Sequence, residues 1–266
     1  KSSDKMVVDQ AQIAALKSAA FAHLHNHSQF SVLQSTIAVG DLVSAAAKYN
    51  MPAVAMTDHG NMMGAFHFVS KVLAHNKEIE AKQQEAQENG DSFEGQIVKP
   101  IVGCEFFVCD DRKDKSRKDN GYQVVFLAKN KAGYHNLAKM ASVAYTEGFY
   151  YVPRIDRSVV ERYKENLIVL SGNLNGEVPN KVLNIGENQA EEALLWWKEQ
   201  FADDFYIEYV KGSAQYRNEN GTFNLADTVI NEKTLVGYKS MNGEIPGCFK
   251  YDGEATIQVR VHKSVN

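Results

Sequence analysis

Residues 21–30 read FAHLHNHSQF, and histidine recurs at every second position, at His23, His25 and His27. Side chains two positions apart on a β-strand point to the same face, so a strand here would turn all three imidazoles the same way. Two imidazoles of an H-x-H pair can bind one zinc ion, and manganese or iron also accepts imidazole. The pattern therefore predicts a metal site. The alternative is that histidines at a strand end bond only to backbone groups.

Strand-like and helix-like patterns alternate along most of the chain. Short apolar runs predict buried strands, and apolar residues at helical spacing predict amphipathic helices. After the histidine segment, the predicted strands are 53–57, 101–108, 122–128, 167–171 and 204–210. The predicted helices are 10–20, 41–49, 61–76, 131–146 and 188–201, and the charged stretch 77–95 is interpreted as a solvated helical extension with a loop. The expected buried stripe of the third helix is Phe66, Val69 and Leu73. This alternation favours a parallel sheet or barrel.

Two polar residues stand out against these apolar strands. His59 follows Asp58 at the end of the strand 53–57, and the carboxyl ends of strands are where α/β proteins place their chemistry. Glu105 lies inside the apolar strand 101–108. A buried carboxylate needs a partner, and a metal ion or an arginine is the usual one.

Charge and composition describe an ordinary globular chain. The 266 residues are 44% hydrophobic and 23% charged, with a formal net charge of −4, so composition gives no support for sequence-independent binding of nucleic acid. The stretch 110–120 mixes both charge signs, which favours a solvated loop over a phosphate-binding patch. No run of about 18 apolar residues predicts a membrane span. The three cysteines, Cys104, Cys109 and Cys248, form no C-x-x-C pair, which favours reduced thiols and a cytoplasmic location.

The sequence pattern changes near residue 210. Beyond it, turn dipeptides at 220–221, 242–243 and 252–253 and an alternating run at 256–261 predict β-hairpins. We therefore predict three parts, namely an N-terminal helical linker at 1–20, an α/β domain at 21–210 and a small β-rich tail at 211–266. Strand edges that the α/β domain leaves open are expected to be covered by the tail or by a second chain.

Five segments carry a more specific signal. They are HLHNHSQFSVLQS at 23–35, AVAMTDHGNMMGAFHF at 53–68, KPIVGCEFFV at 99–108, YQVVFLAKNKAGYHNLAKMASVAYTEGFYYVPRIDR at 122–157 and LIVLSGNLNGEVP at 167–179. In this order they resemble the PHP domain, and more narrowly the PHP domain of the bacterial replicative DNA polymerase III alpha subunit. The resemblance is strongest to alpha subunits in which an exonuclease-like domain precedes the PHP domain. It thus implies that a chain starting at Lys1 is a segment of a longer protein.

The resemblance implies a distorted (β/α)7 barrel, here incomplete, whose active members hold a cluster of metal ions at the carboxyl ends of the strands and hydrolyse phosphoesters. Carried over by position, the metal ligands would be His25, His27, His59 and Glu105. Where the family has Asp, His and Cys at three further ligand positions, this chain has Gln34, Gln123 and Asn173. Neutral amides bind transition metals poorly. The family's last Asp-x-His pair has no counterpart that we recognise after residue 210.

These departures predict a degenerate site that holds at most one divalent ion, zinc, manganese or magnesium, with the three amides hydrogen-bonded in place of metals. The expected role is that of a structural and interaction module. Its partners would be the other domains of the alpha subunit, a proofreading exonuclease subunit, and DNA through the parent enzyme. That parent would be a DNA-directed DNA polymerase, a nucleotidyltransferase whose polymerase site lies outside this segment. The alternative is an active metal-dependent phosphoesterase or 3′–5′ exonuclease. A free-standing phosphatase of the same superfamily fits the residues 134–157 less well.

Overall fold

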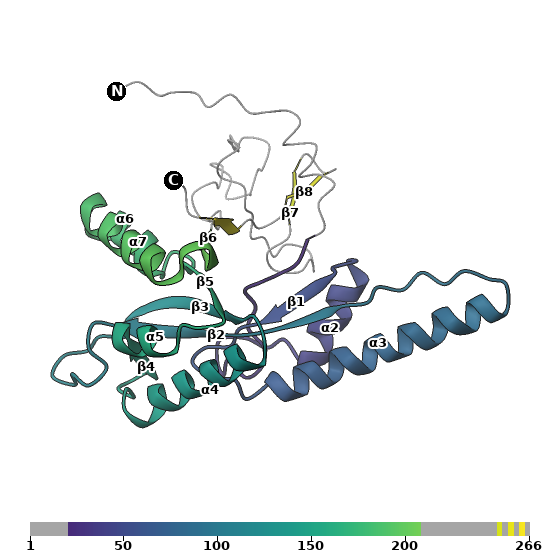
Figure 1. Cartoon of the computed structure of the whole chain (residues 1–266), viewed down its shortest axis with the longest axis horizontal. Coiled ribbons are helices and arrows are strands. Elements are labelled where there is room, and N and C mark those ends of the chain that lie inside the picture. The colour runs from purple at the N-terminus through teal and green to yellow at the C-terminus, as the bar shows by residue number, and fades with distance from the viewer. Residues whose placement is uncertain (1–20, 209–248, 252–254, 258–260, 264–266) are drawn as a thin grey trace, which may run out of the picture. The chain divides into compact units, whose positions relative to one another are not determined.

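The computed structural model describes residues 21–208 and three short strands at 249–251, 255–257 and 261–263 (Figure 1). The predicted helix at 10–20 and most of the predicted tail lie outside these residues, and the domain boundaries stay predictions. The described helices are α2 (Val39–Lys48), α3 (Ala65–Glu88), α4 (Lys131–Thr146), α5 (Arg157–Tyr163), α6 (Glu177–Asn184) and α7 (Glu187–Phe201), followed by the 3₁₀ turn η1 (Ala202–Asp204). The described strands are β1 (Ala53–Met56), β2 (Lys99–Cys109), β3 (Tyr122–Ala128), β4 (Arg154–Asp156), β5 (Leu167–Leu170), β6 (Phe205–Glu208), β7 (Phe249–Tyr251), β8 (Ala255–Ile257) and β9 (Val261–Lys263).

Seven of the described strands form one mixed sheet. Its order is β1-β2-β3-β5-β6-β9, and β4 pairs with β2 beside this path. Among the described strands the path has two open ends, so the α/β fold is an incomplete barrel, as predicted. The expectation that the sheet is parallel is wrong for several pairs, because β2 and β3 form a hairpin across the loop 110–121 and β3 also runs antiparallel to β5. The pairs β1–β2, β2–β4 and β5–β6 are parallel.

Two strand pairs involve the C-terminal part of the chain. In one, β9 pairs antiparallel with β6, which confirms the prediction that residues from the tail cover a strand edge. In the other, β7 and β8 pair antiparallel on either side of the turn predicted at 252–253. The second pair belongs to a separate compact unit from the main sheet.

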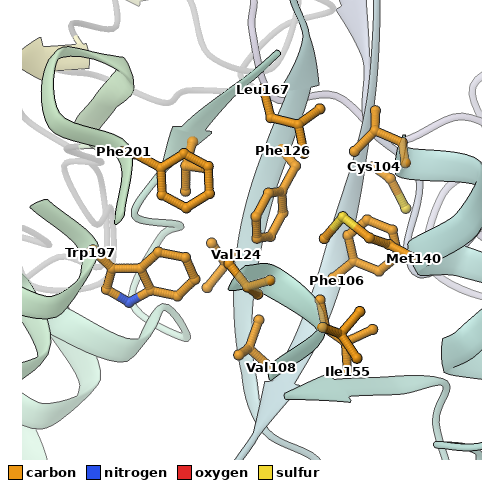
Figure 2. Close-up of a cluster of buried hydrophobic side chains, with 14 of the residues drawn as sticks. Cys104, Phe106, Val108, Val124, Phe126, Met140, Ile155, Leu167, Trp197 and Phe201 are labelled. Atoms are coloured by element: carbon orange, nitrogen blue, oxygen red, sulfur yellow. The ribbon is translucent and has the colours of Figure 1, made fainter. Parts of the chain in front are cut away.

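The main core lies on one face of the sheet, between β2 and β3 and the helices α4, α5 and α7 (Figure 2). Alternate residues of β2 and β3, such as Phe106 and Phe126, point into this core, where Phe126 meets Trp197 of α7. Because side chains alternate along a strand, Glu105 points to the opposite face. The core thus fixes the strand that presents this carboxylate.

Helix α3 buries a different face from the one predicted. Phe66 and Leu73 are 83% and 58% exposed, whereas Phe68 and Val72 are buried. Both sets recur at helical spacing, so the periodicity alone did not separate them. The helix continues to Glu88, which confirms the helical extension predicted after residue 76.

Candidate metal centre

The histidine segment runs beside β1 but is not a regular strand. The backbone oxygen of His23 accepts a hydrogen bond from Ala55 (N–O 2.8 Å), and that of Asn26 accepts one from Thr57 (2.8 Å). Between these bonds the Asn26 side chain donates to the backbone oxygens of both His23 and Ala55. Side chains that bond to the backbone compete with a strand ladder, so the prediction of a continuous strand over 21–30 is wrong.

The three histidines accordingly do not share one site. His25 and His27 lie together, with ring centroids 5.1 Å apart, and the ring of His27 stacks on that of His59 at 3.9 Å. His23 is buried and is absent from the group of side chains that could hold an ion. Burial lowers the pKa of His23 to about 4, so this ring is neutral at pH 7 and belongs to the packing.

Asp58 ties the histidine segment to the end of β1. One carboxylate oxygen accepts from the backbone N–H of Ser28 (2.7 Å) and from the Ser31 hydroxyl (2.6 Å), and the other accepts from the Ser28 hydroxyl (2.7 Å). The Ser31 oxygen in turn accepts from the backbone N–H of His59 (3.1 Å). Asp58 is therefore committed to holding the backbone that carries the imidazoles.

Replacing Asp58 by asparagine is expected to lower the free energy of unfolding by about 2 kcal/mol, because the buried amide nitrogen cannot accept the bonds that a carboxylate oxygen accepts. Chemical denaturation would measure this loss. Asp204→Asn is the matched control, since Asp204 lies in an exposed ion pair with Lys129 and should change stability by less than about 0.5 kcal/mol. Equal stabilities of the two variants would contradict this role of Asp58.

Glu105 is the centre of the polar cluster on this face of the sheet. Its Oε2 atom lies 2.7 Å from Nε2 of His25 and also contacts Nε2 of His27. Its Oε1 atom lies 3.5 Å from Nδ1 of His59. Backbone hydrogen bonds between β2 and the residues after β1 set this arrangement. The N–H of Glu105 donates to the backbone oxygen of Asp58 (3.0 Å), and the N–H of Gly60 donates to the backbone oxygen of Glu105 (2.7 Å).

Glu208 completes the cluster from β6, and the sequence alone did not single it out. Its Oε1 atom lies 2.8 Å from Nδ1 of His25. The local signal was the same as for Glu105, a carboxylate inside an apolar strand, here DFYIEYV at 204–210. The ring of His25 therefore lies between two carboxylates, one at each nitrogen.

Burial and charge oppose each other in this cluster. Burial disfavours the charged form of His25, but Glu208 and Glu105 outweigh it and raise the pKa of His25 well above the usual value. Burial also disfavours the charged form of Glu105, but the hydrogen bonds from His25 and His27 outweigh burial and hold the pKa of this carboxyl below its usual range. Burial lowers the pKa of His59 to about 4 against the attraction of Glu105. Glu105 is therefore ionised and His59 is neutral at pH 7.

The cluster has the atoms that a divalent ion requires. Donor atoms of His25, His27 and Glu105 all lie within 4.8 Å of one another. Nδ1 of His59 and Oε1 of Glu105, 3.5 Å apart, are buried and have no hydrogen-bond partner among the described residues. Buried polar atoms are normally satisfied, so unused donor atoms around a carboxylate fit an ion. Imidazole and carboxylate donors suit zinc or manganese better than magnesium, which prefers oxygen ligands.

The three amide positions do not join this cluster. Gln34 is exposed on the turn after the histidines. The Asn173 oxygen accepts from the backbone N–H of Asn175 (2.9 Å), which closes its own loop. Gln123 lies on β3 in register with Phe107. In the part of the chain that the structure describes, no hydrogen bond joins these three side chains to one another, and the amide network stays a prediction. The family's final Asp-x-His pair would fall after residue 210, where most residues lie outside the described ones.

A mixed α/β sheet that carries three histidines around a buried glutamate is the arrangement of a candidate metal centre. The family model of the PHP domain matches residues 23–211. The chain belongs to the PHP domain family.

The curated proteins that this chain resembles include several alpha subunits of DNA polymerase III. The chain is 38% identical over 192 residues to the DNA polymerase III subunit alpha of Borreliella burgdorferi, a match that covers 71% of this chain and 15% of that protein. The corresponding subunit of Thermus aquaticus is 39% identical over 195 residues, covering 71% and 14%, and that of Deinococcus radiodurans 37% over 199 residues, covering 71% and 13%. The match thus spans less than a sixth of each of these relatives.

None of the helices within the described residues is both long enough and apolar enough to cross a bilayer.

Proposed function

We propose that this chain is the PHP domain of a bacterial DNA polymerase III alpha subunit, a protein of DNA replication, and that it serves mainly as a structural and interaction module with a reduced metal site. The relatives support the first part, and the make-up of the site supports the second. The observation that carries it is that, among the residues that the structure describes, only His25, His27 and Glu105 bring possible ligand atoms together, with His59 adjoining. Gln34, Gln123 and Asn173 offer no charged ligand.

The reduced site would hold one ion through these four residues. When bound, a zinc or manganese ion would act as a Lewis acid and cross-link β1, β2 and the histidine segment. The protein's own contribution is to hold two imidazoles against one carboxylate. An ion that joins three segments from separate parts of the chain stabilises the folded state, because the unfolded chain does not present these ligands together.

The remaining proposals concern the whole protein. As part of an alpha subunit, the domain would pack against the other domains of that subunit, reach DNA through them and offer a surface to a proofreading exonuclease subunit in the cytoplasm. The parent enzyme would be a DNA-directed DNA polymerase.

Elemental analysis of the purified chain tests the reduced site. We expect about one equivalent of zinc or manganese per chain, lost in His25→Ala and retained in His135→Ala, a control that removes an exposed histidine of α4. Two or more equivalents would contradict the reduced site, and so would the same metal content in His25→Ala as in the parent chain.

An active phosphoesterase or 3′–5′ exonuclease is the second candidate. It is favoured by the access that solvent has to the cluster, since the His27 side chain is 24% exposed. Hydrolysis of bis-p-nitrophenyl phosphate with added manganese distinguishes the two functions. Turnover that is lost in His27→Ala and kept in His135→Ala would favour the enzyme, and no turnover with one bound ion would favour the module.

A further inference from the structure

We propose that Glu208 is a positioning residue that orients His25 toward the metal ion. This inference rests on the proposed metal site and adds to it a carboxylate that does not itself bind the ion. Glu208 lies at the end of β6, far in sequence from the histidine segment and from Glu105.

The contact has a defined direction. A carboxylate only accepts hydrogen bonds, so the bond of 2.8 Å between Oε1 of Glu208 and Nδ1 of His25 requires the proton on Nδ1. The other ring nitrogen, Nε2, is then the one that faces Glu105 and the cluster. Metal-binding histidines commonly donate their second nitrogen to a carboxylate in this way, which fixes the ring and strengthens the ligand.

The backbone fixes the position of Glu208. Its N–H donates to the hydroxyl of Ser171 at 2.9 Å, and the N–H of Ser171 donates to the oxygen of Tyr206 at 2.9 Å. These bonds continue the parallel pairing of β5 with β6. The carboxylate therefore projects from a paired strand, and the hydrogen bonds of the sheet hold its backbone in place.

The burial of Glu208 argues against a role in stability alone. The residue is 7% exposed, and Oε2 has no hydrogen-bond partner among the described residues. Burying a carboxylate that has one oxygen without a hydrogen-bond partner lowers the stability of the folded protein. Among the described residues its side chain bonds to His25 alone, so we assign to this buried carboxylate the role of holding that ring.

The variant Glu208→Gln tests the proposal, because it keeps the shape of the side chain and removes its charge. Zinc affinity, measured by competition with a chromophoric chelator, is expected to fall by about 10- to 100-fold, the usual effect of losing an outer partner of a metal ligand. The number of ions per chain is expected to stay the same. In the zinc-loaded chain, the NMR signal of the His25 Nδ1 proton should move upfield, since its acceptor is no longer charged.

Asp204→Asn is the control, because it removes an exposed carboxylate just before the same strand and should change neither readout. Unchanged affinity and an unchanged proton signal in Glu208→Gln would overturn the proposal, and so would the loss of one bound ion, which would make Glu208 a ligand. If the parent chain binds no metal at all, the proposed function fails instead. An altered Nδ1 signal in the metal-free variant would then still support the contact with His25.

Discussion

Replacing Glu105 by glutamine is expected to abolish high-affinity metal binding and to destabilise the metal-free chain. Glu105 faces all three imidazoles of the site and is 1% exposed. Losing an outer partner of a metal ligand usually lowers metal affinity by roughly 10- to 100-fold. Losing the ligand itself should have a larger effect, so we expect zinc affinity to fall by more than about 100-fold. Removing one side of a buried charged contact costs about 3–5 kcal/mol, and we expect a loss near the lower end because glutamine can still accept a hydrogen bond.

Zinc titration and urea denaturation of the chelator-treated chain measure the two effects separately. Glu177→Gln is a demanding control, since Glu177 is also buried and contacts Arg157, Lys181 and Trp197. That variant should lose stability while it keeps the affinity of the parent chain for zinc. If Glu105→Gln bound zinc as tightly as the parent, the carboxylate would not be a ligand and the assignment of the site would be wrong.

Replacing Arg154 by leucine should cost about 4 kcal/mol of folding free energy, although none of its side-chain hydrogen bonds reaches the candidate metal centre. Arg154 is fully buried on β4, and its guanidinium donates to the backbone oxygens of Gly148, Asp119, Arg112 and Asp114. Three of these oxygens belong to the loop between β2 and β3. Each bond to a charged group contributes roughly 1.5–3 kcal/mol, and water that reaches the opened loop recovers part of the sum.

Lysine at this position keeps the charge but lacks the planar fork that reaches several acceptors, so Arg154→Lys should recover less than half of the loss. Arg162→Leu, on an exposed position of α5, should change stability by less than about 0.5 kcal/mol. Thermal or urea unfolding compares the three variants. Faster proteolysis within 110–120 in Arg154→Leu would show that the guanidinium holds the loop, and a loop cleaved at the parental rate would contradict it.

The elements with strong local patterns could be predicted from the sequence. The strand at 122–128 and the helix at 131–146 have the predicted bounds, because the apolar pattern changes abruptly and Asn130 caps the helix by accepting from Gly133. The short elements β4, α5 and α6 were missed, since three to eight residues give little periodicity. Strand direction was also mispredicted, because pairing depends on partners that local sequence does not specify.

The residues of the candidate site could likewise be predicted only in part. Glu105 was found because a carboxylate inside an apolar strand is unusual. His25 and His27 stood out by their alternate spacing and His59 by its place after a strand, and the resemblance to the PHP family implied that all four are ligands. The regular strand expected for the histidines failed because Asn26 and Ser28 bond to neighbouring groups instead of extending a ladder. Glu208 carried the same local signal as Glu105, but its significance depends on a histidine at the other end of the domain.

The contact between His25 and Glu208 spans 183 positions of the chain. At a synthesis rate of about 5–20 residues per second, roughly 10–40 s separate the emergence of the histidine from that of its carboxylate. During that interval the growing chain carries bare imidazoles without the strand that orients them. The contacts of His25 are thus complete only once translation has passed β6, and an early stop upstream of that strand would release a fragment in which His25 lacks its second carboxylate.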